Sequence, residues 1–159
     1  MNRRTPVVTA TLAVTGALAA SLTFGAGAAQ AAPLAVQQIP AVGTGISGLV
    51  VPVKVESRVV AQSTADPMSV RFSAPNGPSQ CATTFNKALV RIDWRNPATG
   101  RFGTVTIKPC PVGYNPGFGT DASVVTGPGR ITFTQVITGS PESATAGLPA
   151  TPGSGTVLR

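Results

Sequence analysis

Past its first third, the chain alternates between apolar and polar positions with a period of two, which is typical of β-strands that bury one face. The alternation is most regular in residues 88–108, where Val90, Ile92 and Trp94 stand between charged side chains. Residues 96–100 interrupt it with the turn formers Asn-Pro-Ala-Thr-Gly. We therefore predict a β-hairpin over residues 88–108, with a buried apolar face and an outer charged face.

Shorter runs of the same pattern predict further strands on both sides of this hairpin. They cover residues 49–56, 68–73, 122–126 and 130–138. Residues 58–62 are expected to pair with the first of these strands or to continue it, and Pro52 places that strand at a sheet edge or beside a bulge. No run after the first thirty residues has a sustained helical period. Short strands separated by glycine and proline turns predict an all-β fold, a small immunoglobulin-like β-sandwich of about seven short strands.

The beginning of the chain has the features of an export signal. Two arginines precede an uncharged apolar stretch from Val7 to Phe24, and small residues lead from there to Ala-Gln-Ala at 29–31. This order predicts a secretory signal peptide over residues 1–31 that is cleaved from the mature protein. A membrane anchor is the alternative, but threonines interrupt the apolar stretch and no charged stop follows it. The paired arginines leave both the general secretory route and folded-state export open.

Cleavage at this point would leave 128 of the 159 residues, enough for one domain with its own core. Residues 32–47 are expected to form a flexible N-terminal arm, and residues 48–138 the sandwich. Residues 139–159 are expected to be a Pro/Gly/Ser/Thr-rich tail or a long loop, with a short final strand near its end. No second apolar segment follows, so we expect no membrane span in the mature protein. The composition resembles that of small exported bacterial proteins, which predicts a secreted, extracellular or envelope-associated location.

The two cysteines, Cys81 and Cys110, both lie in the mature part. Export exposes them to an oxidising compartment, so an even pair predicts a disulfide bond rather than two free thiols. Such a bond would tie the segment before the hairpin to the open end of the hairpin. The chain has no histidine, and two cysteines alone do not form a zinc site, so we expect no metal and no cofactor.

Motifs for catalysis are also missing. Without histidine the commonest general base is absent, and the serines lie in no known nucleophile motif. Residues 117–122 match a loose dinucleotide pattern, and residues 148–152 resemble a sortase signal, but neither has the flanking elements that its chemistry needs. We therefore predict a protein that is not an enzyme. A hydrolase with a carboxylate pair such as Asp93 and Asp121 is a remote alternative.

The mature chain would carry ten basic and five acidic residues, a net charge of +5 that favours anionic partners. Arg91, Arg95, Arg101 and Lys108 are expected on the outer face of the hairpin, where they form either a contact patch or a merely solvated face. Tyr114 and Phe118 are further candidates for exposed contact residues.

These features favour a non-enzymatic extracellular or envelope-associated binding protein. Its partner would be an anionic envelope polymer or an extracellular protein. Nucleic acid is not expected, because stacking aromatic residues do not interleave the basic ones. The alternative function is that of a protease inhibitor or antagonist, in which the stiff segment 108–111 around Cys110 enters a partner's cleft.

Overall fold

The computed structural model describes residues 31–48, 51–112, 115–139 and 150–159. This part of the chain contains eleven β-strands, one short α-helix and one short 3-10 helix. Apart from Ala31, the predicted signal peptide lies outside the described residues, as does the sequence 140–149 that precedes the last strand. Among the described residues, no helix is long and apolar enough to cross a membrane.

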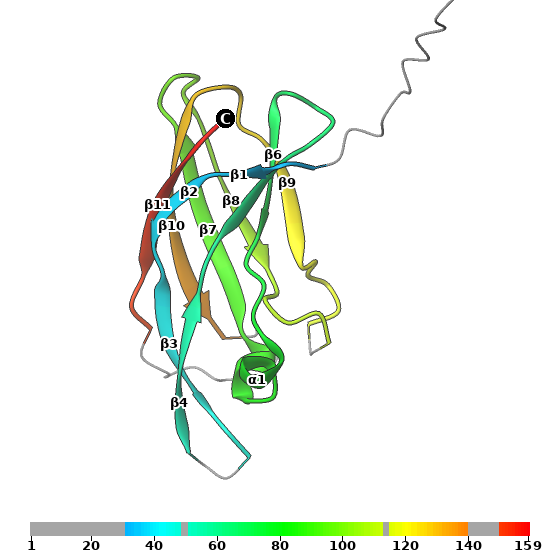
Figure 1. Ribbon diagram of the computed structural model, residues 1–159, viewed down its shortest axis with the longest axis vertical. Coiled ribbons are helices and arrows are strands. Elements are labelled where there is room, and N and C mark those ends of the chain that lie inside the picture. Colours follow the sequence, from blue (N-terminus) through cyan, green and yellow to red (C-terminus); the bar gives the residue numbers. More distant parts are fainter. Residues whose placement is uncertain (1–30, 49–50, 113–114, 140–149) are drawn as a thin grey trace, which may run out of the picture.

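The strands form two larger sheets and one separate pair, all antiparallel. The four-stranded sheet has the order β1 (Pro33–Leu34), β5 (Val60–Ser63), β6 (Ser69–Ser73) and β9 (Asp121–Val125). The five-stranded sheet has the order β2 (Val36–Ile39), β11 (Gly153–Leu158), β10 (Arg130–Thr138), β7 (Leu89–Asn96) and β8 (Arg101–Ile107). The separate pair, β3 (Ala41–Ile46) and β4 (Pro52–Ser57), projects from one end of the molecule (Figure 1).

The core lies between the two larger sheets, because each sheet turns its apolar positions toward the other. Val70 and Phe72 of β6 are fully buried against residues of the five-stranded sheet, and the rings of Phe72 and Phe133 lie 6.2 Å apart. Trp94 joins this cluster from β7 with only 7% of its surface exposed. The apolar positions of the alternating pattern are therefore the ones that are buried between the two sheets, as the sequence suggested.

A second, smaller cluster lies at the end of the molecule that carries the β3–β4 pair. It contains Val55, Phe85, Ala88 and Cys110, which pack beside helix α1 (Pro78–Cys81) and the 3-10 helix η1 (Thr84–Lys87). The predicted disulfide between Cys81 and Cys110 is confirmed, with 5.7 Å between the two Cα atoms.

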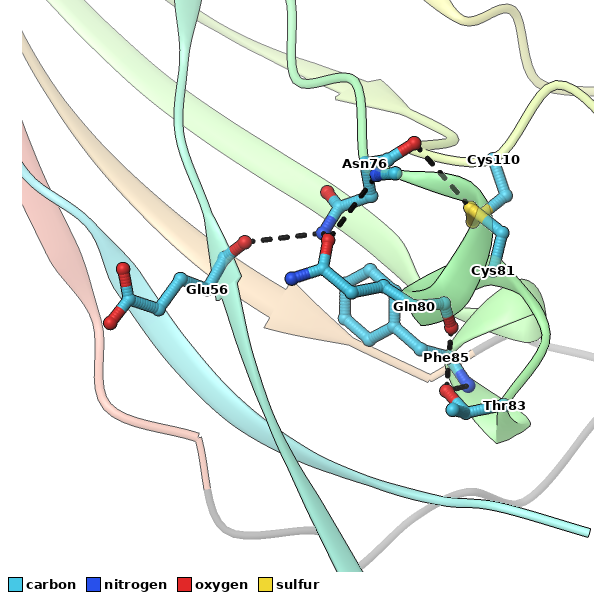
Figure 2. Close-up of a disulfide and its surroundings, with 8 residues drawn as sticks. Glu56, Asn76, Gln80, Cys81, Thr83, Phe85 and Cys110 are labelled. Carbon is cyan, nitrogen blue, oxygen red and sulfur yellow. Dashed lines mark hydrogen bonds between the residues drawn. A yellow bond between two sulfur atoms is a disulfide. The ribbon is translucent and has the colours of Figure 1, made fainter.

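Side-chain amides fasten the disulfide to its surroundings (Figure 2). The amide nitrogen of Asn76 donates to the backbone oxygen of Glu56 at 3.1 Å and to the side-chain oxygen of Gln80 at 2.6 Å. The Thr83 hydroxyl donates to the Gln80 backbone oxygen and accepts from the Phe85 backbone N–H. The disulfide therefore joins a hydrogen-bonded helical turn to the end of the β7–β8 hairpin.

The structure confirms the all-β class and the central hairpin, which is β7 and β8. It also confirms an edge position for the strand with Pro52, since β4 pairs only with β3 among the described strands. Residues 58–62 contribute to β5, which continues from β4 but pairs with β1 and β6 instead.

One predicted boundary is wrong. Most of residues 32–47, expected as a flexible arm outside the domain, form β1, β2 and β3, and Ala41 in this segment is fully buried. The short final strand expected near the end of the chain is confirmed, and it is the six-residue strand β11 between β2 and β10. Among the described residues, the strands reach from residue 33 to residue 158 and number eleven rather than about seven. The segment before the hairpin, in which the sequence has no sustained helical period, contains both α1 and η1.

Candidate functional site

The outer face of the five-stranded sheet presents an ordered array of polar side chains. Its strands lie side by side in the order β2, β11, β10, β7 and β8 (Figure 1). Because side chains alternate across a strand, every second residue of each strand points away from the core. Residues paired in register on neighbouring strands therefore form rows that run across the sheet, with about 4.8 Å between strands.

One row crosses all five strands. We call it the Arg95 row, and it consists of Gln37, Thr156, Thr132, Arg95 and Phe102. It presents, in order, an amide, two hydroxyls, a guanidinium and an aromatic ring. All of its members except the half-buried Thr156 are exposed, and 78% of the Phe102 surface is open to solvent.

The neighbouring row differs in its charge. We call it the Asp93 row, and it consists of Ile39, Ser154, Thr134, Asp93 and Thr104. Asp93 receives a 3.2 Å ion pair from Arg91 and a 2.6 Å hydrogen bond from the Thr104 hydroxyl. The carboxylate of this row is thus held by two partners on the sheet itself.

Between β7 and β11 the two rows form an open groove of about 500 Å³. Its floor carries the short side chains of Thr132, Thr134, Ser154 and Thr156, and the longer Asp93 and Arg95 stand along one side. In the described part of the chain, the hydroxyls of Thr134, Ser154 and Thr156 have no hydrogen-bond partner. The groove therefore offers donors and acceptors that a ligand could use.

The charge beside this groove is a cation without an acidic partner. Arg95 forms no ion pair with any described residue, whereas Arg91 on the same strand pairs with Asp93. Its nearest cross-strand neighbours, Thr132 and Phe102, carry no charge. An anion placed over the Arg95 row could therefore bind the guanidinium without first breaking an ion pair within the protein.

The structure separates the predicted contact residues. Arg91 and Arg95 point outward from β7 as expected. Arg101 does not join them, because it pairs in register with the buried Asn96, and its guanidinium donates to the Val125 backbone oxygen at 3.2 Å. Lys108 follows the end of β8 and is half-buried.

The predicted aromatic contacts are likewise not assembled at this face. Phe118 lies in the loop before β9 and is half-buried, and its N–H donates to the Asn115 backbone oxygen. Tyr114 lies outside the described residues. The sequence reading missed Phe102 and the four groove hydroxyls. The Thr-x-Thr spacing at 132–134 and the Ser-x-Thr spacing at 154–156 were signals for an outward hydroxyl face, but only strand order reveals that they are neighbours.

The segment around Cys110 is folded inward rather than presented to a partner. Pro109 is buried and Cys110 has 1% of its surface exposed, while Pro111 and Val112 are exposed. The Pro109 backbone oxygen accepts a hydrogen bond from the Asn76 N–H at 3.1 Å. Most of the segment expected to enter a partner's cleft is thus engaged within the protein.

The side-chain carboxylates of the described residues stand on different strands or loops, each with its own partners. Glu56 forms ion pairs with Lys54 and Arg58. These contacts lower the pKa of Glu56, and the hydrogen bond from Lys54 has the largest effect. Asp93 has the partners given above. The other two are Asp66, which accepts from Ser69, and Asp121, which lies 3.8 Å from Arg71. Among the described residues, no group of three or more histidine, cysteine, aspartate or glutamate side chains could hold a metal ion.

Comparison of the chain with protein-family models, with curated proteins and with solved structures finds no match. The function is therefore inferred from the geometry and chemistry of the surface.

Proposed function

We propose that this protein is a secreted, non-enzymatic binding module of the cell envelope or its surroundings, and that it binds an anionic polymer on the outer face of its five-stranded sheet. The observation that carries the proposal is the unpaired Arg95 beside a groove floored by free hydroxyls. The net charge of +5 on the mature chain would draw an anionic polymer to the protein from a distance.

The fold that supports this role is, in our proposal, an immunoglobulin-like sandwich. β11, β10, β7 and β8 lie in the order of strands G, F, C and C′ of that fold, and β6 and β9 pair as B and E do. Trp94 is buried on the strand that corresponds to C. The disulfide differs, because it joins the connection before strand C to the connection after C′ instead of joining B to F. Such sandwiches are used for many kinds of binding, so the fold alone does not choose the ligand.

Secretion is supported by chemistry rather than by the described structure of the N-terminus. The disulfide would be rare in a reducing compartment. The non-enzymatic role is supported by the separation of the described carboxylates. The binding role is supported by the unpaired charge of Arg95 and by hydroxyls on strands, whose short side chains lose little conformational entropy on binding.

The proposal is tested by measuring the binding of the mature protein, residues 32–159, to two polyanions, polygalacturonate and polyglutamate. We expect both to bind and Arg95→Ser to weaken binding about tenfold, since a hydrogen bond to a charged group is worth about 1.5 kcal/mol or more. Arg71→Ser is the matched control, because Arg71 is an exposed strand arginine of the other sheet. If neither polymer binds, or if both variants weaken binding equally, the proposed contact face is wrong.

A further inference from the structure

The Arg95 row also indicates which class of anionic polymer fits. We propose that the ligand is an acidic polysaccharide whose chain runs across the strands along the Arg95 row, with a sugar carboxylate on Arg95 and a sugar ring on Phe102. This inference rests on the proposed function, and it adds the ligand class, the direction of the chain and the residues that select it.

The direction follows from the distribution of charge on the face. A polyanion running along β7 would pass from Arg95 to the ion pair of Asp93 and Arg91, where the cation is already occupied and offers nothing to a second anionic group. A polyanion running across the sheet at Arg95 meets only uncharged neighbours, Thr132 on one side and Phe102 on the other. The row therefore offers an anionic chain a path that avoids Asp93.

The ligand class follows from the kinds of group in the row. A sugar unit has hydroxyls at its rim and apolar C–H groups on its ring faces, so it needs hydrogen-bonding partners and a flat apolar surface. Gln37, Thr132 and Thr156 supply the first, and the exposed ring of Phe102 supplies the second. A polypeptide or polyphosphate anion would use Arg95 but would gain little from the remaining members of the row.

The row also favours a carboxylate over a more highly charged group. It holds one guanidinium without an acidic partner, and the fork of an arginine binds a single carboxylate through two parallel hydrogen bonds. In the next row the charge of Asp93 is already balanced by Arg91, so no second free cation is offered to a more highly charged group. A polymer with one carboxylate on a sugar ring, separated from the next by hydroxyl-bearing atoms, fits this spacing of charge.

Phe102 has no structural reason to be so exposed. It lies on β8, an edge strand, and its cross-strand neighbour on β7 is Arg95 rather than an apolar residue. Phe102 has 78% of its surface open to water and contributes nothing to the core. Its burial by a ligand would therefore add a favourable hydrophobic free energy to binding. Replacing Phe102 should therefore alter binding without altering folding.

The test compares three polymers on the mature protein by calorimetric titration. Polygalacturonate carries both sugar rings and carboxylates, dextran carries sugar rings without charge, and polyglutamate carries carboxylates without sugar rings. We expect polygalacturonate to bind at least about tenfold more tightly than either of the others, because only it can use both Arg95 and Phe102. Circular dichroism confirms that each variant is folded.

Phe102→Ser distinguishes this inference from the broader proposal. It should weaken polygalacturonate about tenfold, the factor expected when about half of a phenyl ring no longer leaves water on binding, and should leave polyglutamate unchanged. Val112→Ser, which replaces another exposed apolar residue (87% exposed) outside the row, should change neither. If polyglutamate binds as tightly as polygalacturonate and Phe102→Ser has no effect, the polysaccharide inference is wrong while the anion-binding face stands. If neither polyanion binds, both proposals fail.

Discussion

Asn96 is a buried polar residue next to the binding face, and its replacement by alanine should destabilise the fold. The side chain is fully buried at the end of β7, one residue after Arg95. Its Nδ2 donates to the backbone oxygens of Thr126, Gly127 and Pro128 at 2.9, 3.3 and 3.0 Å. Asn96 thus ties the β7–β8 hairpin to the turn that leads into β10.

The cost of Asn96→Ala can be worked out from the other donors at this turn. The Thr126 backbone oxygen also accepts from the Thr99 hydroxyl, and the Gly127 oxygen also accepts from the Thr126 hydroxyl, so both keep a partner. The Pro128 oxygen loses its donor, and the Ala98 N–H loses the Oδ1 acceptor that lies 3.0 Å away. Two such bonds cost about 1 kcal/mol each, and the space left by the side chain adds about 1 kcal/mol.

We therefore expect Asn96→Ala to lower the free energy of unfolding by about 3 kcal/mol and the Tm by roughly 10 °C. Urea unfolding followed by the fluorescence of Trp94, the only tryptophan, gives the first value directly. Asn96→Asp keeps the volume and the acceptor for Ala98, but it turns an oxygen toward three carbonyls and should cost more than alanine. The exposed Thr134→Val serves as the control. A loss below about 0.5 kcal/mol for Asn96→Ala, or a stable aspartate variant, would show that the Asn96 hydrogen bonds do not hold the hairpin to this turn.

Three further outcomes are expected. Replacing Cys81 and Cys110 by serine opens a link between residues 29 apart and should lower the free energy of unfolding by roughly 3 kcal/mol; urea unfolding measures this, and an unchanged midpoint would show that the bond does not support the fold. Gly153→Ala should destabilise severely, because the added Cβ would overlap the backbone where β2 passes into β3, and an unchanged thermal midpoint would contradict the placement of β11. The pKa of Asp66 is lowered by its hydrogen bond from Ser69, and that of Glu56 by its contact with Lys54. A carboxylate with a lowered folded pKa stabilises the protein fully above its unfolded pKa, which is about 4, and loses this contribution as the pH falls through the folded pKa. Tm should therefore drop as the pH falls below about 5. The drop should be smaller in Asp66→Asn, and an equal drop would show that Asp66 does not contribute.

The sequence predicted those parts of the fold that depend on local pattern. The β7–β8 hairpin alternates strictly, and its turn contains glycine where the backbone adopts a φ of +70° at Gly100, so pattern and turn agree. The sequence did not predict β2 and β3, because β2 has only four residues and β3 contains two glycines, and each acquires a partner only through pairing, β2 with β11 and β3 with β4. The pattern around Gly153 is typical of a loop, but this residue lies in β11. Only glycine fits there, because the backbone at residues 39–41 passes too close for any side chain.

The candidate site was predictable only in part, for a related reason. Arg91 and Arg95 were placed correctly because the alternation along β7 is local. Arg101 was misplaced because its orientation depends on the register across the turn, and in that register it pairs with the inward Asn96 while Phe102 takes the outward position. The hydroxyl groove lies at the junction of β10, β7 and β11, and a strand order that places β11 beside β10 cannot be deduced from pattern alone.

The most direct test of the central claim is to map the binding face by nuclear magnetic resonance, titrating the isotope-labelled mature protein with short polygalacturonate oligomers. We expect amide signals to change along the Arg95 row, at Thr156, Thr132, Arg95 and Phe102. Signals on the outer face of the other sheet, such as that of Arg71, should stay in place. Changes centred on Arg71, or spread evenly over all the basic residues, would contradict a binding site on the five-stranded sheet.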